Sequence, residues 1–197
     1  MMNKEFYILL SILLFIGFGT AVVISRHDDN SRKNPFDDIQ HTVCLDLRHK
    51  AVRFFLNRDI IEAENHLRRL LKINSDDREM MLLYGRILLE TGRVQEAEKL
   101  FRKMVSGNPL DWGAKNNLGA VLLLRNKYEA ALREFQLASR NDTAVQYAGE
   151  NLKTVSKALE LLRQNKKFIL VINTSAQNLQ KHIGVITLSV LEAKTEI

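Results

Sequence analysis

The chain has 197 residues, of which 46% are hydrophobic and 26% charged, and its net charge is +6 at pH 7. This composition predicts a folded chain with a packed core, and the low content of proline and glycine excludes collagen-like and low-complexity classes. The single cysteine, Cys44, excludes an intramolecular disulfide framework and a cysteine-based zinc site.

An apolar run without a charge, residues 6–25, lies near the amino terminus. A helix of this length spans about 30 Å, which matches the hydrocarbon thickness of a bilayer. We therefore expect a transmembrane helix within residues 1–25. A retained anchor is favoured over a cleaved signal peptide, because the apolar run continues beyond the small residues at 19–21.

Two opposing cues bear on the orientation of this segment. Arg26, Arg32 and Lys33 follow it, and basic residues favour the cytoplasmic side. The short tail before it resembles that of bacterial signal-anchors, which export the domain that follows. We take export as the prediction: a single-pass protein of the bacterial inner membrane with its domain in the periplasm. The alternative is the opposite orientation, in which the domain faces the cytoplasm.

Residues 26–43 are rich in Asp, Asn and Arg, and they contain the pair Asn34-Pro35, which interrupts regular structure. A segment of this composition buries little apolar area, so we expect a flexible linker.

Residues 44–145 repeat with a period of 34, which is the decisive feature of the sequence. Each unit reads as two amphipathic helices joined by a turn, at 57–59, Gly92 and Asn126. Small residues such as Gly85 and Ala97 are expected to let the two helices of a unit cross closely, while Phe101 fills the space between units. The repeating columns are Ala51, Gly85 and Gly119; Ala63, Ala97 and Ala131; Leu67, Phe101 and Phe135; and Leu70, Met104 and Ala138.

This pattern resembles the tetratricopeptide repeat (TPR) family. Two units carry the resemblance: Tyr84-Gly85 with Gly92, Ala97, Phe101 and Pro109, and Asn117-Leu118-Gly119-Ala120 with Tyr128, Ala131, Phe135 and Ala138. The first unit departs from the family pattern, with Ala51 in place of glycine and Ser75 in place of the closing proline; the third unit has Thr143 there. The resemblance implies an all-α solenoid of helical hairpins, with about three repeats and a capping helix over residues 44–165.

The segments after the third unit allow alternatives. Residues 145–164 form an amphipathic helix, which is either a cap or an incomplete fourth repeat. Residues 166–197 form an apolar tail with two β-branched runs, 168–172 and 183–191, whose structure is uncertain and which suit a short β-hairpin. Because an isolated hairpin is marginal in water, these runs must pack on the solenoid, on a second copy or on a partner.

No catalytic constellation is evident, so we predict that the chain is not an enzyme and needs no cofactor or metal. His41, Cys44 and His49 do not have the spacing of a familiar metal site. Basic residues are interspersed with acidic ones, which argues against nucleic-acid binding.

The resemblance implies that the first helix of each unit lines a concave groove that binds a protein partner. The residues expected to line this groove are largely apolar, which suits an amphipathic helix or an apolar extended peptide. Of the five positions that clamp a terminal carboxylate in chaperone-binding members, only Arg48 keeps the chemistry, so acidic chaperone tails are not expected to bind. The groove positions are Arg48, Val52, Phe55, Glu79, Leu82, Arg86, Leu89, Asn116, Ala120 and Leu123.

Together these features predict a membrane-tethered scaffold that presents its groove to a partner peptide or helix in envelope assembly or biogenesis. The alternative is a structural oligomer subunit whose apolar tail packs into its own groove or into that of a second copy.

Overall fold

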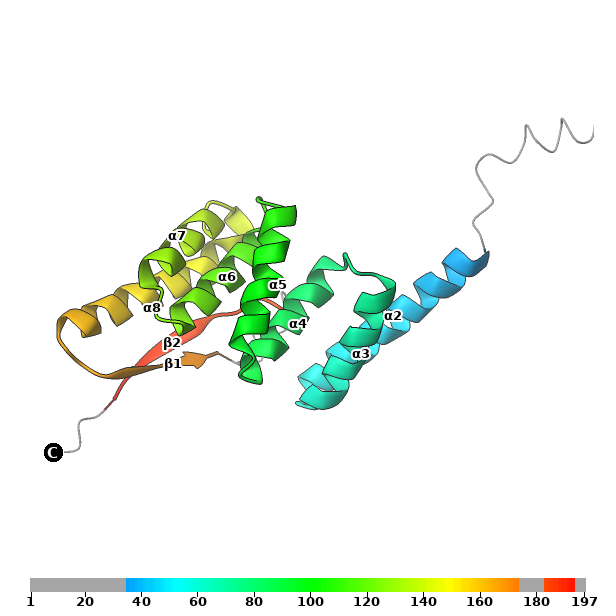
Figure 1. Ribbon diagram of the computed structural model, residues 1–197, viewed down its shortest axis with the longest axis horizontal. Helices are drawn as coiled ribbons and strands as arrows, with labels where there is room; N and C mark the ends of the chain where they lie inside the picture. The colour runs from blue at the N-terminus through cyan, green and yellow to red at the C-terminus, as the bar shows by residue number, and fades with distance from the viewer. Residues whose placement is uncertain (1–34, 174–182, 194–197) are drawn as a thin grey trace, which may run out of the picture. The chain divides into compact units, whose positions relative to one another are not determined.

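The computed structural model describes residues 35–173 and 183–193 (Figure 1). The apolar run at 6–25 lies outside these residues, and none of the described helices is long and apolar enough to cross a membrane. The chain divides into two compact units between Val43 and Cys44.

Helix α2 (Pro35–Leu56) begins inside the segment that the sequence predicted to be a flexible linker. This is a correction for residues 35–43. Proline is well tolerated at the first position of a helix, because the N–H that it lacks has no partner there, and its φ is already helical. An acidic residue in the first turns, Asp38, favours the positive end of the helix dipole. The breaker Pro35 thus starts a helix.

Three helical hairpins follow one another along the second unit. They are α2 with α3 (Ile60–Ile73), α4 (Arg78–Glu90) with α5 (Val94–Gly107), and α6 (Trp112–Leu124) with α7 (Tyr128–Ala138). A short 3-10 helix, η1 (Asp142–Ala144), leads into α8 (Val145–Arg163).

The turn inside each hairpin is built in the same way. The chain takes a left-handed conformation at Arg58, Gly92 and Asn126, with φ of 65°, 78° and 60°. Glycine and asparagine adopt this conformation at low cost, which is why the sequence marks the second and third turns clearly. Helices α4 and α6 begin alike, because the side chains of Asp77 and Asp111 accept hydrogen bonds from backbone N–H groups of the first turn.

Close packing within the second and third hairpins pairs a glycine with an aromatic ring. A Cβ at Gly85 would lie 2.2 Å from the ring of Phe101, and one at Gly119 would lie 2.6 Å from the ring of Phe135. The ring of Phe101 thus packs against Gly85 inside its own hairpin, and it also belongs to the core cluster that includes Leu118 of the next hairpin. The first hairpin has Ala51 and Leu67 at the same repeat positions, and both are fully buried.

The C-terminal residues form a two-stranded antiparallel sheet, β1 (Phe168–Ile172) and β2 (Leu188–Glu192), with Leu170 opposite Val190. Strand β2 packs beside α8 (Figure 1). The predicted strand 183–191 is shorter in the structure, and residues 185–187 form no strand ladder. Among them, the N–H and carbonyl of Ile186 are bonded by asparagine side chains of the solenoid, and the carbonyl of Thr187 accepts from the N–H of Asn173.

Candidate functional site

Residues 183–193, which we call the C-terminal tail from here on, cross α4, α6 and α8. The backbone of the tail is held by a row of side chains from three helices, one after another along the solenoid. Arg86 comes from α4, Asn116 and Asn117 come from α6, and Asn151 and Thr154 come from α8. The tail therefore fills a groove that these helices line.

Asn117 and Asn151 bind the tail in the manner of a neighbouring β-strand. Asn117 donates from Nδ2 to the carbonyl oxygen of Gly184 (2.8 Å), and its Oδ1 accepts from the N–H of Ile186 (2.9 Å). Asn151 repeats this two residues further along, donating to the carbonyl of Ile186 (2.9 Å) and accepting from the N–H of Leu188 (2.8 Å). Each amide thus replaces one backbone partner of an extended chain.

Two further side chains complete the row. Asn116 donates to the carbonyl of Ile186 (2.8 Å) and its Oδ1 accepts from Asn151 (2.9 Å). The hydroxyl of Thr154 donates to the carbonyl of Leu188 (2.7 Å). The three asparagines are fully buried. Because a buried polar group without a partner costs about 1–3 kcal/mol, this row requires an extended chain in the groove.

Arg86 binds the chain where the tail begins. Its guanidinium donates to the carbonyls of Ile183 and Asn173 (3.2 Å each) and pairs with Glu90 (2.8 Å). It also lies over the ring of Phe55, 5.2 Å from the centroid. The side chain is almost completely buried, so these partners compensate for its lost hydration.

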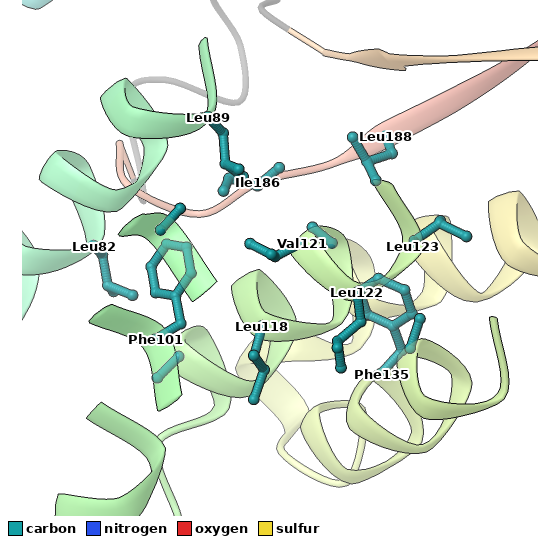
Figure 2. Packing of buried hydrophobic residues seen from close by; sticks show 14 of the residues in the cluster. Leu82, Leu89, Phe101, Leu118, Val121, Leu122, Leu123, Phe135, Ile186 and Leu188 are labelled. Carbon is teal, nitrogen blue, oxygen red and sulfur yellow. The ribbon is translucent and has the colours of Figure 1, made fainter. Parts of the chain in front are cut away.

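The side chains of the tail complete the core. Ile186 and Leu188 are buried in one cluster with Leu89, Val121 and Leu123 (Figure 2). Full burial of such a side chain stabilises by roughly 1.5–3 kcal/mol. The tail therefore contributes both backbone hydrogen bonds and apolar contact to the folded state.

The other end of the groove is open. A cavity of about 540 Å³ lies between α2, α4 and the start of the tail. Its wall is apolar at Val52, Leu56 and Met80, and the cavity also has charged side chains. Arg48 is fixed there by Asp77 (2.7 Å) and Glu79 (2.8 Å).

Comparison with known proteins agrees with this geometry. Residues 54–105 match the model of the tetratricopeptide repeat family. Residues 54–105 are therefore a tetratricopeptide repeat segment of the solenoid. The search of curated proteins found no match.

Solved structures show the same fold. A structure of MamA superposes with a TM-score of 0.51 at 19% identity, covering 59% of this chain and 64% of that one. A tetratricopeptide repeat protein from Parabacteroides merdae ATCC 43184 superposes with a TM-score of 0.51 at 18% identity, covering 60% of this chain and 48% of that one. The chain thus spans less than two thirds of either protein. TPR domains bind protein partners and are in general not enzymes, so the fold is that of an interaction scaffold.

The predicted TPR groove residues fall into three groups. Arg86 and Asn116 bond the tail, and Arg48, Val52 and Glu79 line the open cavity. Leu82 lies both in the cavity wall and in the core. The remaining four are buried in the core: Phe55, Leu89, Ala120 and Leu123. Binding of a separate partner to these residues stays a prediction.

Sequence reasoning missed Asn117, Asn151 and Thr154 as groove residues of the TPR domain. A signal was present, because Asn151 follows Asn117 by one 34-residue period. The same spacing shows that α8 continues the register of first helices, as an incomplete fourth repeat would. Among the described residues, no cluster of His, Cys, Asp and Glu could hold a metal ion.

Proposed function

We propose that the protein is a membrane-tethered scaffold that holds an extended segment of a partner protein in its TPR groove, in an envelope assembly or biogenesis process. The observation that carries this proposal is the row of amides that bonds the backbone of the tail. The tail shows which ligand shape the groove accepts.

The chemistry of the row favours an extended peptide over a helix. Asn117 and Asn151 each need one N–H and one C=O that are free and two residues apart. A helix uses these backbone groups internally and would leave the buried amides without partners. An extended chain satisfies them whatever its side chains are, in the same way as strand addition.

The tether is supported by the apolar run at 6–25. Protease digestion of intact and lysed spheroplasts tests both the tether and its orientation. We expect the domain to stay with the membrane fraction and to be cut in intact spheroplasts. Protection until lysis would place the domain in the cytoplasm, and recovery in the soluble fraction would reject the tether.

Photo-crosslinking in the native membrane tests the groove. A crosslinker at Leu56, which is 46% exposed and lines the open cavity, is expected to form an adduct with a second polypeptide. The matched control is Ile61, which is 75% exposed and does not line the cavity. Equal adducts from both positions, or none from Leu56, would contradict a partner at this end of the groove.

The second candidate is a structural oligomer in which the tail enters the groove of another copy. The contacts of the tail favour this candidate, because the tail of a second copy has the same sequence and can make the same hydrogen bonds in the groove. Sedimentation of the full-length protein in detergent tests this candidate. A single species with the mass of one chain would reject it.

A further inference from the structure

We propose that the groove selects a glycine followed at the second and fourth positions by branched apolar residues, the pattern of Gly184, Ile186 and Leu188, and that the tail is a displaceable occupant of this site. This inference rests on the proposed function, because it names the kind of segment that the TPR groove takes.

Gly184 carries the strongest constraint. A Cβ at this position would lie 2.5 Å from the backbone nitrogen of Leu83 and 2.6 Å from the carbonyl carbon and Cβ of Leu82. These atoms belong mainly to the backbone of α4 and have little freedom to move. The glycine is needed for this close approach and not for its φ, because Gly92 is the only described glycine with a positive φ.

The apolar positions follow at a spacing that the amides set. Asn117 bonds residues 184 and 186, and Asn151 bonds residues 186 and 188, so the register of the bound chain is defined. In that register the side chains of Ile186 and Leu188 are 0% and 1% exposed and meet the core of α4 to α8 (Figure 2). A charged residue at either position would be desolvated without a partner.

The contacts of the tail allow a partner segment to replace it in the groove. Most of the hydrogen bonds to residues 184–188 come from side chains of the solenoid, and the sheet beside them has only two strands, which is marginal alone. The open cavity continues the groove beyond Gly184 and leaves room for a second segment to enter. A foreign segment must compete with a covalently attached one, whose effective concentration is on the order of millimolar.

The test compares three full-length chains: wild type, Gly184→Leu and the control Gly107→Leu, where an added Cβ has no atom within 4 Å. Two fluorescent peptides are titrated, one with the sequence of residues 183–193 and one with leucine in place of its glycine. The native peptide is expected to bind the Gly184→Leu chain at least about tenfold more tightly than the other two chains, because the tail no longer competes. The leucine peptide is expected to bind that chain at least about tenfold more weakly than the native peptide.

Each other outcome overturns a defined claim. Equal binding of both peptides would reject selection for glycine and leave the extended-peptide groove standing. Absence of binding by either peptide, in a Gly184→Leu chain with wild-type circular dichroism, would reject the groove as well. Loss of the helical signal in that chain would show that the tail is a permanent part of the core, which rejects displacement.

Discussion

The two ends of the groove are built from hairpins of the same repeating plan, and they differ in whether the tail covers them. At the α6–α8 end the tail is bonded by buried amides, whereas at the α2–α4 end a cavity stays open. The position that bonds the tail recurs with the repeat period as His49, Leu83, Asn117 and Asn151. Only the third hairpin and α8 carry asparagine at this position, and there it bonds both an N–H and a C=O of the tail.

A substitution at the α6–α8 end of the groove, which the tail fills, is expected to have the largest effect on stability. Asn151→Leu leaves the buried N–H of Leu188 without a partner and removes one of the two donors to the Ile186 carbonyl, which keeps Asn116. We expect the free energy of unfolding to fall by about 3 kcal/mol. Urea denaturation measures this change. A loss below about 1 kcal/mol would show that the amide row contributes little to holding the tail.

The packing inside the hairpins gives the next largest effect. Gly119→Ala drives a Cβ into the ring of Phe135, and overpacking of this kind costs about 1–3 kcal/mol. The first hairpin has alanine and leucine at these two positions, Ala51 and Leu67. The double variant Gly119→Ala/Phe135→Leu should therefore recover part of the loss, which a double-mutant cycle in urea measures. Additive losses would contradict direct contact as the cause.

An ion cluster that joins neighbouring hairpins predicts a pH dependence. Burial raises the pKa of Glu98, but hydrogen bonds from Arg102 and Arg125 and the charge of Lys127 outweigh it and lower the pKa from 4.5 to about 2. Because the folded-state pKa is lowered, this stabilisation is present above about pH 4.5 and is lost as the pH falls towards 2.

Glu98→Gln should therefore lower the free energy of unfolding at pH 7 by about 1–2 kcal/mol, with a smaller difference from wild type near pH 2.5. Glu64 occupies the same repeat position in the first hairpin and pairs with Arg93, so Glu64→Gln should behave alike. Glu129→Gln, on the exposed surface of α7, is the control. A pH-independent difference for Glu98→Gln would contradict this origin.

The smallest effect is expected at the open end. His49 shares the repeat position of Asn151 but is exposed beside the cavity. His49→Leu should change the free energy of unfolding by less than about 0.5 kcal/mol, as surface substitutions usually do. An effect as large as that of Asn151→Leu would remove the distinction between the two ends.

Much of the fold could be predicted because its signals are local or periodic. The turns at Gly92 and Asn126 and the aligned Gly85 and Gly119 reflect backbone conformation and close packing, and both leave a mark in the residue type. Asn34-Pro35 was misread, because the same proline that breaks a helix interior can begin a helix.

The candidate site was only partly predictable. Arg86 and Asn116 were found from the repeat position, but the partners that they bond, Ile183 and Ile186, lie 97 and 70 residues away. Nothing local marks which surface an apolar run will cover. A β-branched run such as 168–172 suits a hairpin, a second copy and a groove equally well.

The sequence by itself determined the repeat period, the two helices of each unit and their turns, because these follow from hydrophobic spacing and backbone preference over a few residues. Only the tertiary structure decided that the tail lies in the groove and that Asn117 and Asn151 act as its strand partners. That choice depends on long-range shape: a glycine must fit against the backbone of α4 while two buried amides find N–H and C=O groups at the same register.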